Sequence, residues 1–186
     1  RDKQLEKYLT EKEKNLNVVS QKDQDQIDDL LDQIKKLGGK PSTSSSDKKI
    51  IIKELSKQLD ALNVKNVLQD KNKNIIKDEN INNIKVRFQK ISDLSPKDLR
   101  KLVDEGKNYL KEGIVIVCAS KDDKVGLAIG VTNSLINDYD AVQLVKAGSE
   151  IIGGKGGGGR KDFAQAGGNK VEMIDEAFTK IKSLIK

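Results

Sequence analysis

Apolar residues recur at helical spacing among charged ones in two early stretches of the chain, 2–16 and 20–37. Ser20 is suited to cap the N-terminus of the second stretch, and the pair Gly38 and Gly39 is suited to end it. The pattern therefore predicts two separate amphipathic helices before residue 40.

A polar, serine-rich segment at 41–47 follows and predicts a flexible linker, with Asp47 as the cap of a third helix that continues to about residue 68. The apolar stripe of this third helix has to be buried, either against the neighbouring helices or against a second chain. We expect it to serve dimerisation through Ile51, Leu55, Leu59 and Leu62.

From about residue 84 the pattern changes to alternating strands and helices. A strand with alternating polarity, a helix beginning at Ser95-Pro96, two wholly apolar strands joined by a tight turn, and two further helices follow in that order. The stretch "DENINNI" before the first strand is interpreted as a turn, and Cys118 as a small buried hydrophobe.

The expected fold class is α/β (α+β), with a small mixed or antiparallel sheet of three or four strands flanked by helices. An all-α, coiled-coil-like subdomain precedes it. We place the helical subdomain at 1–80 and the globular domain at 81–186, with a glycine-rich loop at 153–168.

Composition narrows the chemistry that the chain can perform. The 186 residues contain no histidine, no tryptophan and a single cysteine, so histidine-based catalysis, zinc sites and disulfide frameworks are excluded. A net charge of +6 is compatible with binding to nucleic acid but does not require it. No apolar run is long enough to span a membrane, and we expect a cytoplasmic protein. Because the chain begins at Arg1 and not at a methionine, we expect it to be a piece of a longer protein.

The stretch "IIGGKGGGGRKDFAQAGG" at 151–168 contains the most unusual chemistry, because glycine is the residue that gives up most conformational freedom on folding. It formally contains G-x-G-x-x-G, but it follows a helix where the dinucleotide motif follows a strand, and Lys155 is not followed by Ser or Thr as in a P-loop. Bare backbone instead allows a partner to approach closely and lets several N–H groups converge on one anion.

Cations surround this glycine run, and Arg160 offers a planar fork that suits phosphate or a guanine edge. The candidate contacts to nucleic acid are Lys155, Gly156, Gly157, Gly158, Gly159, Arg160, Lys161, Gln165, Gly167, Gly168 and Lys170. No catalytic residue and no metal ligand are expected among them.

The motif "GGKGGGGRKDFAQAGG", preceded by "SPKDLRKLVDEGKNYLKEGIVIVCAS" and "KVGLAIGVT", resembles the C-terminal signature of bacterial-type alanyl-tRNA synthetases over about residues 80–186. Across 1–80 the resemblance rests on helical texture and order, and the serine-rich insert departs from the usual continuous helical stretch.

That resemblance implies a non-catalytic, tRNA-binding C-terminal domain of an ATP-dependent alanine–tRNA ligase. Its partners would be tRNA-Ala, the other domains of the ligase and, through the helical part, a second copy. It would contact the tRNA elbow and help to bring tRNA to the aminoacylation and editing sites. ATP, magnesium and zinc would be used by other domains, and no cofactor is expected here.

Two alternatives stay open. The chain could be the substrate-binding domain of a DHH-type phosphoesterase or nuclease, whose related glycine-rich loop serves a neighbouring catalytic domain. It could also be a purely structural dimerisation module in which the glycines only permit packing.

Overall fold

A computed structural model describes residues 2–97 and 99–186, which form two compact units that divide between Asn66 and Val67. The sequence pattern predicts this boundary at residue 80. We call the first unit the helical unit and the second the sheet unit.

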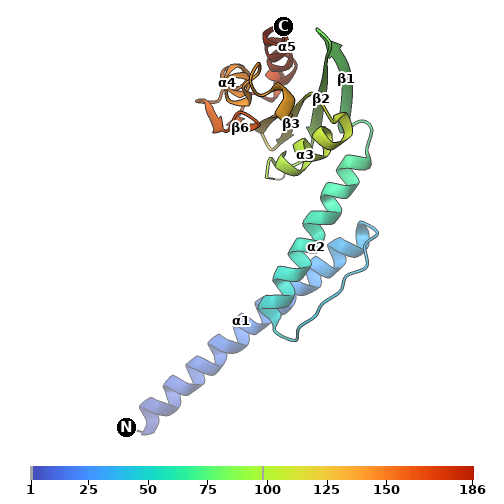
Figure 1. Ribbon diagram of the computed structural model, residues 1–186. Helices are drawn as coiled ribbons and strands as arrows, with labels where there is room; N and C mark the ends of the chain where they lie inside the picture. The colour runs from blue at the N-terminus through green and yellow to red at the C-terminus, as the bar shows by residue number, and fades with distance from the viewer. Residues whose placement is uncertain (1, 98) are drawn as a thin grey trace. The chain divides into compact units, whose positions relative to one another are not determined.

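The helical unit consists of two helices, α1 (Asp2–Lys36) and α2 (Lys48–Gln69), the second of which continues into the first residues of the sheet unit (Figure 1). The prediction of two helices before residue 40 is wrong, because nothing between residues 16 and 20 breaks a helix and Ser20 lies inside α1. The predicted end at Gly38 is confirmed by its φ of 82°, and Asp47 accepts a hydrogen bond from the Lys49 N–H (2.9 Å) at the start of α2.

The apolar stripe of α2 packs within the chain. Leu55 and Leu59 are buried against Ile27, Leu30 and Ile34 of α1. Ile51 and Leu62 join the same cluster as half-buried side chains. The four residues expected to serve dimerisation therefore pack against α1 of the same chain.

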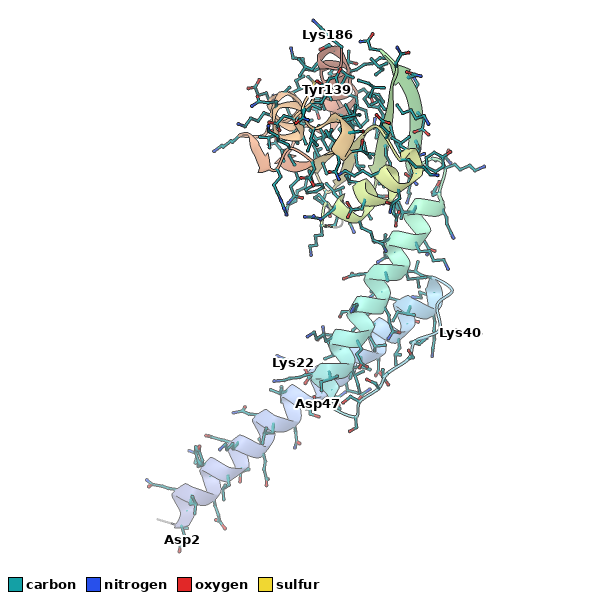
Figure 2. All side chains as sticks on the ribbon, in the orientation of Figure 1. Asp2, Lys22, Lys40, Asp47, Tyr139 and Lys186 are labelled. Atoms are coloured by element: carbon teal, nitrogen blue, oxygen red, sulfur yellow. The ribbon has the colours of Figure 1, made fainter. Side chains whose placement is uncertain are left out.

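The serine-rich segment is hydrogen-bonded to α2. The sequence predicts a flexible linker at this place, so the structure differs from the prediction. The Ser42 N–H donates to the Gln58 side chain and the Ser44 N–H to Glu54, each at 3.0 Å. By contrast, apolar side chains in the first half of α1, such as Leu5 and Leu16, are exposed. Figure 2 shows the side chains of this half, from Asp2 onward, standing out from the helix on all sides.

The sheet unit contains a six-stranded sheet with the order β1-β2-β3-β4-β6-β5, in which only β2 and β3 run parallel. Helix α3 (Leu99–Leu110) connects these two parallel strands. The strands are β1 (Asn74–Ile81), β2 (Ile84–Ser92), β3 (Ile114–Lys121), β4 (Lys124–Val131), β5 (Gly157–Gly159) and β6 (Phe163–Gly168).

Helices cover the two faces of this sheet unequally. Helix α3 packs on one face, over β3 and β4. Helices α4 (Ala141–Ile151) and α5 (Ile174–Leu184) lie on the other face and form the main core with Ile116, Leu127 and Ile129 (Figure 1). Cys118 belongs to this core, and burial raises the pKa of its thiol to about 12, which agrees with the expected buried hydrophobe.

The α/β fold class is confirmed, but the expected three or four strands are too few. The segment "DENINNI", which the sequence pattern predicts to be a turn, is mostly β1, with only Asn82 and Asn83 in the turn to β2. The glycine-rich segment contributes β5 and β6. None of the described helices is long and apolar enough to cross a membrane.

Candidate nucleic-acid interface

The glycine-rich segment forms a hairpin at one edge of the sheet. β5 pairs antiparallel with β6, so that Gly157 lies opposite Ala166, Gly158 opposite Gln165 and Gly159 opposite Ala164. β6 in turn pairs with β4, which leaves β5 as the outermost strand.

Backbone N–H groups of this segment donate hydrogen bonds to the protein itself, although the sequence predicts that they are free to bind an anion. The Gly154 N–H donates to the Ser149 carbonyl oxygen (2.8 Å) and the Gly156 N–H to the Ser149 hydroxyl (3.3 Å). The following three glycines form a strand. The structure thus differs from the expected loop in which several N–H groups converge on one anion.

Some glycines of the hairpin are required by packing. A Cβ atom at Gly154 would lie under 3.0 Å from the Gly167 carbonyl oxygen, and one at Gly168 under 3.0 Å from the Ile152 carbonyl oxygen. Backbone cannot yield as a flexible side chain can, so these two positions bring α4 and β6 close together.

Gly158 and Gly167 are different. A Cβ at Gly158 would meet nothing within 4 Å, and one at Gly167 would meet only the Val125 carbonyl oxygen, at 3.7 Å. Both residues are exposed, and neither has a positive φ. Packing among residues 2–97 and 99–186 therefore gives no reason for glycine at either position.

The two open glycines share the α3 side of the sheet with Phe163 and Gln165. Gly167 lies opposite Gly126 and Gln165 opposite Ala128, and the Cβ position of Gly126 points toward α3. Because residues along a strand alternate between faces, the four residues form one surface, which we call the open glycine face: Gly158, Phe163, Gln165 and Gly167.

A shallow groove of about 460 Å³ borders this face and separates it from the start of α3. Pro96 and Leu99 form its far wall, and Gln165 and Gly167 form its near wall. No hydrogen bond from the Gln165 side chain is found within the described residues, so its amide is available to donate and to accept.

The predicted cations lie at the two ends of β6 and do not form one cluster. Lys155 and Lys170 belong to one end, and Arg160 and Lys161 to the other, separated by a six-residue strand of about 20 Å at roughly 3.3 Å per residue. All four are exposed, and none takes part in the ion pairs formed among residues 2–97 and 99–186.

The structure adds a cation that the sequence analysis missed. The guanidinium carbon of Arg100, on α3, lies 5.0 Å from the centre of the Phe163 ring, at the border of the open glycine face. The two residues are 63 positions apart, and only the packing of α3 on the sheet brings them together, so no local sequence signal marks Arg100.

Among the described residues, no group of three or more His, Cys, Asp or Glu side chains could hold a metal ion. The surface offers cations that can contact phosphate groups, an amide that can contact polar base edges, and backbone that a ligand can approach closely. These features suit a nucleic acid.

Comparison with protein families matches residues 83–186 to the DHHA1 domain. The chain belongs to the DHHA1 domain family. The open glycine face and all the predicted contact residues lie within the matched range, whereas the helical unit lies outside it.

Curated proteins similar to the chain include alanine–tRNA ligases. The enzyme of Parvibaculum lavamentivorans is 48% identical over 103 residues, covering 55% of this chain and 12% of the relative. That of Hyphomonas neptunium is 41% identical over 106 residues, covering 57% and 12%. The chain therefore spans only about an eighth of the length of these relatives.

A solved structure of the C-Ala domain from the Aquifex aeolicus alanyl-tRNA synthetase also matches, with 28% identity and a TM-score of 0.55. The match covers 59% of this chain and 97% of that one. The resemblance of this DHHA1 domain to the C-terminal region of alanyl-tRNA synthetases is thereby confirmed.

Proposed function

We propose that this chain is the tRNA-binding C-terminal part of an alanine–tRNA ligase and that its open glycine face contacts tRNA at the elbow. The similarity to alanine–tRNA ligases supports the choice of RNA, and the chemistry of the face supports its role as the contact surface.

The observation that carries the proposal is the open space over Gly158 and Gly167. A glycine in a strand weakens it, by roughly 0.5–1 kcal/mol relative to alanine, and packing within the chain offers no compensation at these two positions. Close approach of an external backbone is a reason for a strand glycine that remains after packing is excluded.

The surrounding side chains have separate tasks in this proposal. Lys155, Arg160, Lys161 and Lys170 contact phosphates on both sides of the face, which positions the RNA without reading its sequence. Gln165 donates and accepts hydrogen bonds at a base edge or a 2′-hydroxyl group. Gly158 and Gly167, with Gly156 nearby, leave the backbone uncovered for the RNA. Gly157, Gly159 and Gly168 are required by packing within the chain and shape the hairpin that presents this surface.

No reaction is assigned to this chain. Its part is to hold the tRNA for the aminoacylation and editing sites of the whole ligase, where ATP, magnesium and zinc would be used. A cytoplasmic location is part of the same proposal.

Titration of labelled tRNA-Ala by fluorescence anisotropy tests the proposal, with Arg160→Ala compared with wild type. The loss of one well-placed arginine should weaken binding by about 1–3 kcal/mol, and the affinity of the wild type should fall as salt rises. Lys180→Ala, which removes the same charge from an exposed position on α5, on the other face of the sheet, is the matched control and should bind almost as wild type.

Two further ligands separate the alternatives. A preference for single-stranded DNA over tRNA would favour the substrate domain of a DHH-type phosphoesterase. Failure to bind any nucleic acid would favour a structural module, and equal affinities of wild type and Arg160→Ala for tRNA would count against the assigned surface.

A further inference from the structure

The opposite edge of the sheet is an uncovered strand. β1 has eight residues and, within the described part of the chain, pairs only with β2, and the large apolar side chains of Ile75 and Ile76 are 51% and 46% exposed. An exposed edge strand offers a row of backbone donors and acceptors to any strand that can match it.

The turn between β1 and β2 determines which backbone groups face outward. Asn82 and Asn83 have φ values of 51° and 65°, and Ile81 lies opposite Ile84, which is the geometry of a two-residue hairpin. In an antiparallel pair hydrogen-bonded and non-hydrogen-bonded positions alternate, so the odd-numbered residues of β1 bond to β2. The even-numbered residues direct their N–H and C=O groups to the open edge, and these are Asn74, Ile76, Asp78 and Asn80.

The side chains on the α5 side of β1 follow an order that is complementary to itself. Read along the strand they are Ile75, Lys77, Glu79 and Ile81. The first three line a groove against α5, and Ile81 packs on the core of that face. Reversed by an antiparallel partner, this row sets isoleucine against isoleucine and lysine against glutamate.

We propose that β1 pairs antiparallel with β1 of a second copy of this chain, in the register centred on Asp78. Ile75 then lies opposite Ile81 of the second copy and Lys77 opposite Glu79, twice each by symmetry. The outward-facing residues Ile76 and Asn80 exchange backbone hydrogen bonds, as the hairpin geometry requires.

The neighbouring registers are less favourable, which makes the prediction specific. A shift of two residues in one direction sets Lys77 against Lys77, and a shift in the other direction sets Glu79 against Glu79. Like charges directly opposite each other destabilise an antiparallel pair. A shift by one residue would turn the two rows to opposite faces.

The central contact between two Asp78 residues is compatible with the proposal because each carboxylate is already neutralised. The Arg87 guanidinium donates to both Asp78 oxygens, at 2.8 and 2.9 Å. Lys77 contacts Glu79 of its own strand at 3.1 Å, and it would exchange this neighbour for Glu79 of the second copy while Lys182 stays on Glu79.

Charge complementation tests the pairing. Wild-type protein should show a rise of molar mass toward twice the monomer with concentration in sedimentation equilibrium. Lys77→Glu alone and Glu79→Lys alone set like charges opposite each other and should stay monomeric. An equimolar mixture of the two variants restores opposite charges at both pairs and should dimerise again. Lys124→Glu, with the same charge change at the start of β4, should dimerise like wild type.

Cysteine cross-linking fixes the register without altering an ion pair. Ile76→Cys and Asn80→Cys, mixed, place the two Cα atoms about 5.5 Å apart, within the range of a disulfide. Each variant alone leaves its cysteines four residues out of register. Oxidation should therefore link the mixture and neither variant by itself, and buried Cys118 should not react.

Three results would overturn the proposal: a wild-type monomer at every concentration, a dimer that survives in both single charge variants, or no cross-link in the cysteine mixture. The second result would point to another surface, such as the exposed half of α1.

Discussion

Two parts of the same sheet face carry glycines for opposite reasons. On β4, Gly126 and Gly130 lie under α3, and a Cβ on either would come under 3.0 Å from a side-chain atom of Pro96 or Val103. On β6 and β5, Gly167 and Gly158 lie on the same face where none of the described helices covers them. Gly126 and Gly167 are even direct cross-strand neighbours.

The difference shows how a glycine can be assigned to packing or to binding. Under α3 the missing side chain is replaced by another element of the same chain, so the position is satisfied in the folded monomer. Beyond α3 the space remains open to solvent. The conformational entropy that glycine loses on folding is therefore not offset by any packing contact until a partner binds.

The largest expected effect is the difference in stability between two single variants, Gly126→Ala and Gly167→Ala, each of which adds one methyl group to the cross-strand pair. Gly126→Ala should destabilise the fold by about 1–3 kcal/mol because the helix has to move or distort. Gly167→Ala should leave the stability unchanged or raise it by up to about 1 kcal/mol, because its Cβ enters open space and alanine costs less conformational entropy than glycine. Urea unfolding measures both, and equal losses would remove the distinction between the covered and the open glycines.

A smaller effect is expected for the amide on the open glycine face. Gln165→Ala should weaken tRNA binding by about 0.5–1.5 kcal/mol, the usual net worth of a hydrogen bond, and should leave stability unchanged. The control is Gln143→Ala, which removes an exposed amide from α4. Anisotropy titrations that give the same affinity for both variants would exclude Gln165 from the contact.

The smallest effect concerns the other flank of α3, where Arg87 stacks on Tyr109 at 4.1 Å as Arg100 does on Phe163. Hydrogen bonds from Arg87 hold the pKa of Asp78 below its ordinary 3.8. Folding therefore favours the carboxylate, and the pair stabilises the protein above that value.

This stabilisation is lost as the pH falls through the lowered pKa of Asp78 in the folded state. Asp78→Asn should accordingly reduce stability near neutral pH and flatten its decline in acid. Thermal unfolding from neutral pH to below pH 4 measures this. A parallel decline in wild type and variant would show that the pair contributes nothing.

Much of the fold could be predicted because burial leaves a clear pattern. β3 and β4 are covered on both faces at their centre and appear as unbroken apolar runs, and the helices after residue 95 carry regular stripes. β1 could not be predicted, because an edge strand that carries Lys77, Asp78 and Glu79 looks polar. β5 and β6 contain mainly glycine and alanine, which lack the side chains typical of strands.

The site was only partly visible in the sequence. The cations and glycines of 153–168 could be selected by type and spacing. The position of α3 on the sheet determines which glycines are left uncovered, and the same packing places Arg100 beside Phe163. Neither can be predicted from local sequence. The stripe Ile51–Leu62 illustrates the same limit, because a pattern that demands burial does not name the partner.

The most direct test of the open glycine face is the tRNA affinity of Gly158→Val, measured together with its melting temperature. Valine suits a strand, and its Cβ would meet no atom of the described residues within 4 Å, so the melting temperature should not fall. The added side chain stands where the RNA backbone is proposed to approach, and the affinity should drop at least about tenfold, equal to roughly 1.4 kcal/mol. A stable variant that binds tRNA as tightly as wild type would contradict the account.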